Sequence, residues 1–464
     1  MIPAIKLFKT PISRYFYDAN KDEILSITEE EFSFLESNKD LSEALLAKSD
    51  RLLQLYHEGY LHPIQTVKIE HPLTPYVTEI LDRCLQKVTL QLTQNCNFRC
   101  TYCTYTSSNG SQRFHSKRSM TFDVAKKAVD YLYAHSIDAP YMYIGFYGGE
   151  PLLEFELMKQ VVAYANGLFS KKKLRYTITT NASVLNDEII QFLKENNFSL
   201  VISLDGPERI HNKNRVFANS QKGTFKVVIE KLKRLHTLEP EFFKKIIINM
   251  VIDPSNDFNE VLSLFDEYPF LKECSSQINV IDDYFLDKKN VVSESYIESM
   301  EYQTFLGYLY LQRRIQEKNI PVSVVSKVSR LQDDLVQKFN GSHPIDVVSA
   351  PGGPCVPGKV RLLVTVDGKF IPCERVSETS EVMCLGDVEK GIDMKRAIQM
   401  LNIAQITSDA CRKCWAFLHC GSCIKTADGG TCFSASERLK YCENTRRNVL
   451  YSLKELTMLR ECQI

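Results

Sequence analysis

The chain has 464 residues, 44% of them hydrophobic, with 57 basic and 57 acidic side chains. That length predicts about two to four domains with buried cores, and the balanced charge argues against nucleic acid as a main partner. No apolar run approaches the roughly 20 residues needed to cross a bilayer, and the N-terminus lacks a signal-peptide pattern, so we expect a cytoplasmic protein without a membrane partner. In that reducing setting, the 15 cysteines more often bind metal or do chemistry than form disulfides.

The N-terminal residues predict a small module of strands and helices. An aromatic strand pattern at residues 15–17 is followed by turn-forming residues and by an alternating pattern at residues 24–27, which is typical of a hairpin. Thr28 and Glu31 have the spacing of a capping box, and leucines continue a helical period after them. We expect residues 1–72 to form a module of winged-helix type.

From residue 87 onward, strand-like runs alternate with amphipathic helical runs. Such alternation predicts an α/β fold with a parallel sheet and helices outside it, and six repeats suit a partial barrel. Active sites in barrels of this kind gather at the C-terminal ends of the strands. The predicted strands are 87–93, 141–147, 174–180, 198–205, 245–252 and about 277–282, and the helices between them lie near 121–136, 153–170, 186–196, 223–236 and 256–267.

The last part of the chain is dense in cysteine. A long helical stretch over residues 293–338 leads to a break rich in glycine and proline. Beyond this break, short strand signals at 360–365 and 369–371 precede a final helix. We therefore expect a barrel domain with bridging helices over residues 73–340 and a separate C-terminal domain over residues 341–464.

Three cysteines directly follow the first predicted barrel strand. Cys96, Cys100 and Cys103 have the spacing C-x3-C-x2-C, and an aromatic residue, Tyr102, precedes the third. Three thiolates on a short loop can hold three irons of a [4Fe–4S] cluster and leave the fourth iron for a non-protein ligand. A zinc site normally has four closed ligands, and His115, the nearest further candidate, lies twelve residues on.

This loop, placed where a strand opens a partial barrel, resembles the cluster loop of radical S-adenosylmethionine (SAM) enzymes. The resemblance covers roughly residues 85–285 and implies that the open iron binds the amino and carboxylate groups of SAM. It also implies SAM contacts for Tyr102 at the adenine, for Gly148, Gly149 and Glu150 at the amino group, for Asn181, Ser203 and Asp205 along the ribose and methionine, and for Arg215 at the carboxylate. Taken singly, each of these motifs also fits an ordinary turn, helix cap or surface charge.

The C-terminal cysteines resemble the SPASM extension of radical SAM enzymes, which houses two auxiliary [4Fe–4S] clusters. One spacing departs from the family pattern, because Cys420 and Cys423 have two residues between them where three are usual. By resemblance, the outer cluster is held by Cys411, Cys414, Cys420 and Cys442, and the inner cluster by Cys355, Cys373 and Cys423. Either Cys432 or Cys384 completes the inner cluster, or an open iron binds a substrate thiolate. A pair of zinc knuckles is the alternative for these cysteines.

A carboxylate next to the cysteines is a candidate for proton transfer. Glu374 directly follows Cys373, where sulfatase-maturing relatives carry a catalytic aspartate. The resemblance implies that Glu374 takes a proton from the substrate, and a plain surface glutamate is the alternative.

The N-terminal module is similar to the recognition element of enzymes that modify ribosomally made peptides. Such elements bind a leader peptide by strand addition, where backbone hydrogen bonds supply affinity and side-chain pockets supply choice. A stabilising subdomain without a ligand is the alternative. Together the resemblances imply a partial (β/α)6 TIM-type radical SAM barrel with an N-terminal winged-helix-like peptide-recognition module and a C-terminal cysteine-rich SPASM domain.

We therefore expect a radical SAM peptide maturase that uses SAM and three [4Fe–4S] clusters. Its expected reaction cleaves SAM to a 5′-deoxyadenosyl radical, takes hydrogen from a ribosomally made Cys-rich precursor peptide with a leader, and installs sulfur-to-carbon thioether crosslinks. The expected reductant is a protein such as flavodoxin or ferredoxin. The alternatives are sulfatase maturation to formylglycine, carbon–carbon crosslinking of a peptide, and a zinc-stabilised binding protein without catalysis.

Overall fold

The computed structural model describes residues 1–106, 112–170, 172–286, 289–316 and 345–462, together with 320, 321, 324, 325, 328, 329 and 333. Backbone contacts divide the chain into two compact units. The first comprises Met1–Val77, Ser329–Val356 and Lys395–Ile464, and the second comprises Thr78–Val328 and Pro357–Met394. Within the described residues, no helix combines the length and the apolar character needed to span a bilayer.

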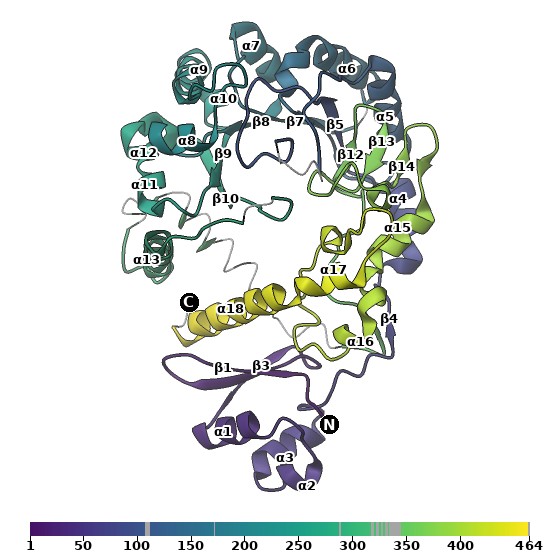
Figure 1. Ribbon diagram of the computed structural model, residues 1–464, viewed down its shortest axis with the longest axis vertical. Coiled ribbons are helices and arrows are strands. Elements are labelled where there is room, and N and C mark those ends of the chain that lie inside the picture. The colour runs from purple at the N-terminus through teal and green to yellow at the C-terminus, as the bar shows by residue number, and fades with distance from the viewer. Residues whose placement is uncertain are drawn as a thin grey trace. The chain divides into compact units, whose positions relative to one another are not determined.

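The second unit is built on a sheet in which six successive strands, from β5 to the edge strand β10, are parallel and adjacent in chain order (Figure 1). This arrangement confirms the predicted α/β partial barrel. The six strands are β5 (Lys87–Thr93), β6 (Met142–Gly148), β7 (Leu174–Thr180), β8 (Phe198–Ser203), β9 (Ile247–Ile252) and β10 (Ser275–Val280).

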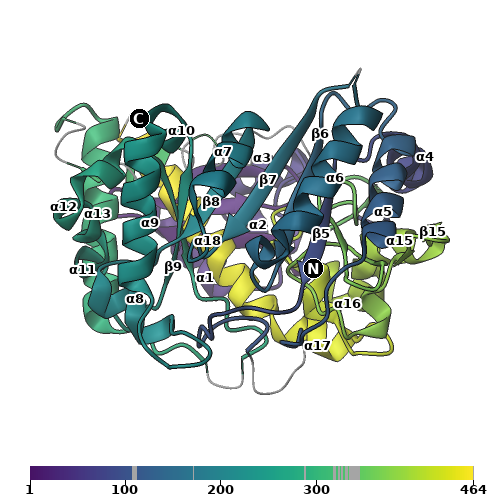
Figure 2. The same cartoon turned by 90° about the horizontal axis from the view of Figure 1, so that it is seen from above.

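Helices cover the outer side of these strands, as Figure 2 shows for α5 to α9. Helices α5 and α7 begin at capping residues, because the side chains of Thr121 and Asn186 accept hydrogen bonds from backbone N–H groups of the first turns. Among the described residues, the α-helices between residues 77 and 311 include α4 (Val77–Arg83), α5 (Phe122–Ala134), α6 (Phe155–Leu168), α7 (Asp187–Glu195), α8 (Glu208–Asn214), α9 (Phe225–Leu238), α10 (Pro240–Phe243), α11 (Phe258–Leu262), α12 (Leu264–Glu267) and α13 (Glu294–Leu311). Much of the predicted helical stretch after α13 lies outside the described residues.

The two faces of the barrel sheet differ in polarity. In β6 and β9, fully buried apolar residues alternate with partly exposed ones. Because successive side chains of a strand point to opposite faces, one face lies under the helices and the other lines the inside of the barrel. A Cβ on Gly145 would lie 3.1 Å from the hydroxyl oxygens of both Thr89 and Thr177. The inner face therefore carries hydroxyl groups next to Gly145.

The sheet continues beyond β5 with four short strands from the C-terminal part of the chain. Strand β12 pairs parallel to β5, with Leu362 opposite Val88. The added strands are β12 (Leu362–Val364), β13 (Lys369–Ile371), β14 (Gly386–Asp387) and β15 (Gly391–Ile392). Residues that we predicted to belong to a separate C-terminal domain thus extend the barrel sheet.

The first unit contains the N-terminal module. Its antiparallel sheet of β1 (Ile5–Lys9), β2 (Arg14–Asp18) and β3 (Glu23–Ile27) confirms the predicted hairpin and adds β1, and the helices that follow are α1 (Glu29–Ser37), α2 (Glu43–Leu46) and α3 (Asp50–His57). The predicted capping box opens α1: Glu31 N donates to Thr28 Oγ1 at 3.1 Å, and Thr28 N donates to Glu31 Oε2 at 2.8 Å. Apolar side chains of the sheet and helices form a core of their own around Phe16.

The same unit includes the cysteine-rich end of the chain. Its remaining elements are β4 (Lys68–Ile69), β11 (Val348–Ser349), α15 (Met394–Leu401), α16 (Ser408–Cys411), α17 (Ala435–Lys440) and α18 (Cys442–Glu461). Helix α18 contacts β1 (Figure 1), and Glu461 Oε1 at its end accepts hydrogen bonds from Thr10 and Tyr15. A buried hydrogen bond of 2.5 Å joins His419 to Asp22. The N-terminal module and the cysteines from Cys411 onward therefore belong to one unit.

Candidate active site and cluster sites

The loop after β5 brings the thiols of Cys96, Cys100 and Cys103 together. Backbone hydrogen bonds hold the loop, since Arg99 N donates to Val216 O and Thr101 N donates to Asn214 O. Burial raises the pKa of the Cys96 and Cys100 thiols to about 12, and repulsion between neighbouring thiolates adds to the effect. The three sulfurs are thus near enough to act on one another, and a metal cluster that takes them as thiolates must displace their protons.

Gly148 and Gly149 let the end of β6 approach this loop. A Cβ on Gly148 would lie 2.3 Å from Thr93 O, and a Cβ on Gly149 would lie 2.1 Å from Asn95 O. Gly148 also has φ of +138°, which disfavours other residues. Both glycines are therefore required for contact between backbone segments. Their predicted role beside SAM stays a prediction.

Glu150 is a buried carboxylate at the end of β6. It accepts hydrogen bonds from Thr180 Oγ1 at 2.6 Å, from Asn181 N at 2.7 Å and from Leu152 N at 3.0 Å. Burial nevertheless raises the pKa of Glu150 to about 7. Asn181 Nδ2 lies 3.8 Å from Cys96 Sγ. The structure thus brings Glu150 and Asn181 to the edge of the cysteine loop, and their contacts with SAM stay a prediction.

Asp205 and Arg215 form a buried ion pair on the other side of the loop. Arg215 Nε and Nη2 donate to the two carboxylate oxygens of Asp205 at 2.7 and 3.1 Å, and Tyr102 OH donates to Asp205 Oδ2 at 2.5 Å. Burial opposes ionisation, but Arg215 and these hydrogen bonds hold the pKa of Asp205 below its usual value. Arg215 Nη1 lies 3.9 Å from Cys100 Sγ. Ser203 ends β8 two residues before Asp205.

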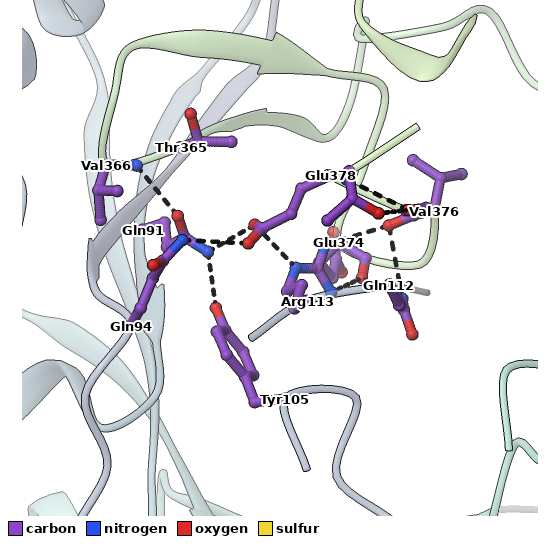
Figure 3. Close-up of polar contacts among 12 residues, drawn as sticks. Gln91, Gln94, Tyr105, Gln112, Arg113, Thr365, Val366, Glu374, Val376 and Glu378 are labelled. Carbon is purple, nitrogen blue, oxygen red and sulfur yellow. Dashed lines mark hydrogen bonds and ion pairs between the residues drawn. The ribbon is translucent and has the colours of Figure 1, made fainter. Parts of the chain in front are cut away.

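A polar network that we did not predict lies beside β5 and is drawn in Figure 3. Its centre is Glu378, which accepts hydrogen bonds from Gln91 at 2.7 Å, Gln94 at 3.2 Å and Arg113 at 3.3 Å. Arg113 has no exposed side-chain surface and also donates to the backbone carbonyls of Glu374 and Val376. Arg113 therefore holds residues 374–378 in place.

This network also approaches the cysteine loop. The guanidinium of Arg113 lies 5.8 Å from the ring centroid of Tyr105 and lowers the pKa of the Cys103 thiol, which burial raises. The sequence signal for the network was Gln91, an amide between two leucines in the predicted strand at residues 87–93. Arg113 and Glu378 carry no pattern that distinguishes them from surface residues.

Glu374 has a different environment from Glu378. Its carboxylate forms an ion pair of 2.9 Å with Arg361, and the two side chains are 29% and 51% exposed. Lys87 lies nearby, and burial lowers the pKa of this lysine while Glu374 opposes the change. Glu374 is thus a partly exposed carboxylate, and its predicted role in proton transfer stays a prediction.

Comparison with known proteins agrees with this geometry. Residues 90–267 match the model of the Radical SAM superfamily. The chain carries a radical SAM domain. It is therefore an enzyme, and such a domain uses SAM together with a [4Fe–4S] cluster. The three thiols fit the cluster, and the Glu150 carboxylate suits the ammonium group of SAM.

Relatives of the radical SAM domain include enzymes that mature sulfatases. An uncharacterized protein of Methanocaldococcus jannaschii is 34% identical over 155 residues, covering 33% of this chain and 49% of that protein. A cysteine-type anaerobic sulfatase-maturating enzyme of Clostridium novyi is 25% identical over 292 residues, covering 60% of this chain and 71% of the enzyme. The chain thus spans about half the length of the first relative.

A solved structure shares the fold. The protein anSMEcpe with bound AdoMet has a TM-score of 0.55 at 20% identity, over 80% of this chain and 99% of that chain. The same protein with AdoMet and the Kp18Cys peptide has a TM-score of 0.54. At this identity the likeness concerns the fold.

Outside the radical SAM domain, the first unit places four of the predicted cluster cysteines around one pocket. This pocket, of about 240 Å³, is lined by Cys411, Cys414, Cys420 and Cys442. Burial raises the pKa of the first three thiols, and repulsion from neighbouring thiolates contributes. Among the described residues, no three His, Cys, Asp or Glu side chains converge as a single metal ion requires. Thiols spread around a pocket fit a cluster of several irons.

The cysteines predicted for the inner cluster are divided between the units. Cys355, Cys423 and Cys432 belong to the first unit, and Cys373 and Cys384 belong to the second. The thiol of Cys384 donates a hydrogen bond to Gly386 O at 3.4 Å. The ligand set of the inner cluster stays a prediction.

Proposed function

We propose that this radical SAM enzyme is a peptide maturase that installs thioether crosslinks in a ribosomally made Cys-rich precursor. The observation that carries the proposal is that a four-cysteine pocket and a strand-bearing N-terminal module share one unit of the chain. The pocket supplies a place for an auxiliary cluster, and the module supplies an edge strand for a peptide. A sulfur-to-carbon bond requires both a bound peptide and an acceptor for one electron.

The residues around the cysteine loop position the radical chemistry. When bound, SAM and its cluster supply a 5′-deoxyadenosyl radical that takes a hydrogen atom from an unactivated carbon. Cys96, Cys100 and Cys103 would hold the cluster. Glu150 would attract the ammonium group of SAM, and the buried Asp205–Arg215 pair fixes Tyr102 beside Cys100. Because Glu150, Asp205 and Arg215 are buried, their side chains also keep water away from the radical.

The N-terminal sheet has an edge suited to a leader peptide. Within the described residues, strand β3 pairs only with β2. The carbonyl of Ser26, an exposed residue of β3, accepts a hydrogen bond of 2.7 Å from Arg51 of α3, so this carbonyl faces away from β2. N–H and C=O of one strand residue point to the same side. The Ser26 N–H is therefore positioned to bind an added strand.

A pair of substitutions at Ser26 tests leader docking. Ser26→Pro removes the outward N–H and leaves the β2–β3 ladder intact, whereas Ser26→Ala keeps that N–H. Loss of one backbone hydrogen bond, with the steric effect of the ring, should weaken precursor binding by about tenfold. Fluorescence anisotropy with a labelled precursor measures the change. Equal affinity of the two variants would argue against docking on β3.

The maturation of a sulfatase is the second candidate function. It is supported by the identity to the Clostridium novyi enzyme and by the shared fold with anSMEcpe. Both candidates need SAM cleavage and a peptide, so they differ in the product rather than in the radical step.

Mass spectrometry after anaerobic turnover separates the two candidates. The full chain, with its clusters reconstituted, is incubated with SAM, reductant and either a Cys-rich precursor or a sulfatase peptide. Thioether formation should remove about two hydrogens per crosslink and leave no free thiol at the crosslinked cysteine. An aldehyde on the sulfatase peptide, with an unchanged precursor, would favour sulfatase maturation.

A further inference from the structure

A buried arginine faces the four-cysteine pocket of the first unit. Arg438, on α17, is 2% exposed and lines the pocket with the four cysteines. Its Nη1 atom is buried and has no hydrogen-bond partner. A buried donor without an acceptor costs about 1–3 kcal/mol, and native structures rarely keep one. This donor therefore indicates a ligand with an acceptor atom in the pocket.

The charged side chains around the pocket indicate the charge of that ligand. Arg438 and Arg446 both line the pocket together with the four cysteines. No acidic side chain is among the residues that line the pocket. Two guanidinium groups beside four thiols suit a ligand that bears negative charge and accepts hydrogen bonds at sulfur.

We propose that Arg438 is a positioning residue that donates a hydrogen bond to a sulfur of the outer iron–sulfur cluster and raises its reduction potential. This inference rests on the proposed function, which places that cluster in the pocket. A cluster with four thiolate ligands is negatively charged, and one-electron reduction adds a further negative charge. A buried cation at short range stabilises the reduced form more than the oxidised form.

A raised potential has a place in thioether formation. Joining a peptide thiol to a carbon radical forms the S–C bond, releases the thiol proton to solvent and leaves one electron. An outer cluster held by Cys411, Cys414, Cys420 and Cys442 would supply the acceptor for that electron. Arg438 makes this transfer more favourable because the reduced cluster gains the stronger attraction.

Redox titration of the full chain tests the inference. Cys96, Cys100 and Cys103 are replaced with alanine so that only auxiliary clusters contribute, and a Cys411→Ala variant identifies the signal of the outer cluster. Arg438→Gln should shift the ratio of reduced to oxidised cluster at a fixed potential by about tenfold toward the oxidised form, which is 59 mV for one electron. Lys440→Gln, which removes an exposed cation from the same helix, should change nothing.

The Arg438→Lys variant separates the effect of the positive charge on the potential from a structural effect of the substitution. Arg438→Lys keeps the cation and should shift the ratio by much less than Arg438→Gln. Full iron with an unshifted potential in Arg438→Gln would overturn the inference. If Arg438→Gln loses iron, the test passes to Arg438→Lys. A tenfold shift of the ratio in Arg438→Lys at full iron content also overturns the inference, because the cation is still present. No iron at the outer site of the unsubstituted Arg438 protein would instead overturn the proposed function.

Discussion

Replacing Arg113 with methionine should destabilise the radical SAM domain strongly. Arg113 has no exposed side-chain surface, and its partner Glu378 is 6% exposed. Methionine fills a similar length but leaves the Glu378 carboxylate buried with only Gln91 and Gln94 as donors. Removing one partner of a buried ion pair costs about 3–5 kcal/mol, because the remaining charge has lost its compensation.

An exposed arginine of the same region is the matched control. Arg361, which is 51% exposed, pairs with Glu374. Exposed pairs contribute about 0–1 kcal/mol, so Arg361→Met should cost less than 1 kcal/mol by the same rule. Adding Glu378→Gln to Arg113→Met removes the buried charge and should recover roughly half of the loss. The difference in stability between Arg113→Met and Arg361→Met therefore measures the effect of burial, because both variants lose one arginine.

The loss should also depend on pH. Burial raises the pKa of Glu378 above its usual 4.5, and Arg113 opposes that rise. Without Arg113 the folded-state pKa rises further, so the folded chain binds a proton that the unfolded chain has lost. Stability then falls as pH increases from about 4.5 through the folded-state pKa. Arg113→Met should accordingly be least harmful near pH 5 and most harmful near pH 8.

Hydrogen exchange measured by mass spectrometry reports the loss of stability in individual segments of the chain. Because the chain has two units, a single unfolding curve does not assign the change to one of them. Peptides covering Lys87–Thr93 and Met142–Gly148 report on the strands beside the network. Equal exchange in Arg113→Met and Arg361→Met, or no recovery with Glu378→Gln, would refute the assignment of this pair as a stabilising contact.

Three further predictions concern the cluster pocket, the cofactor site and the N-terminal module. Cys411→Ala combined with Cys414→Ala should remove about four irons per chain and preserve SAM cleavage; unchanged iron would contradict the pocket assignment. Burial raises the folded-state pKa of Glu150 from 4.5 to about 7, so stability should fall by about 3 kcal/mol as pH rises from below 4.5 to above 7. Glu150→Gln should remove that dependence, measured at each pH as the difference from the unsubstituted chain in hydrogen exchange of peptides covering Met142–Gly148, and an unaltered pH dependence would speak against it. His419→Ala removes a buried hydrogen bond to Asp22, costs about 1–3 kcal/mol, and should speed hydrogen exchange in β2 and β3; unchanged protection there would count against this link.

Local sequence patterns were enough to predict many of the strands and helices and the cysteine loop after the first barrel strand. The strand at residues 87–93 and the helix cap at Thr28 follow from side-chain period and from short-range hydrogen bonding, which act within a few residues. The spacing of Cys96, Cys100 and Cys103 places three thiols on one loop regardless of the rest of the chain. The radical SAM assignment rests on such local information.

Contacts between residues far apart in the sequence could not be predicted and became visible only in the tertiary structure. Arg113 and Glu378 are 265 residues apart, and each looks like a surface charge until burial removes water from both. The same holds for Asp22 and His419, which are 397 residues apart. It also holds for Arg438, whose Nη1 donor is buried in the lining of the cysteine pocket without a hydrogen-bond partner. The sequence by itself determined which residues form strands, helices and cysteine loops. Only the fold decided which charges are buried and paired, because desolvation depends on every element that surrounds a group.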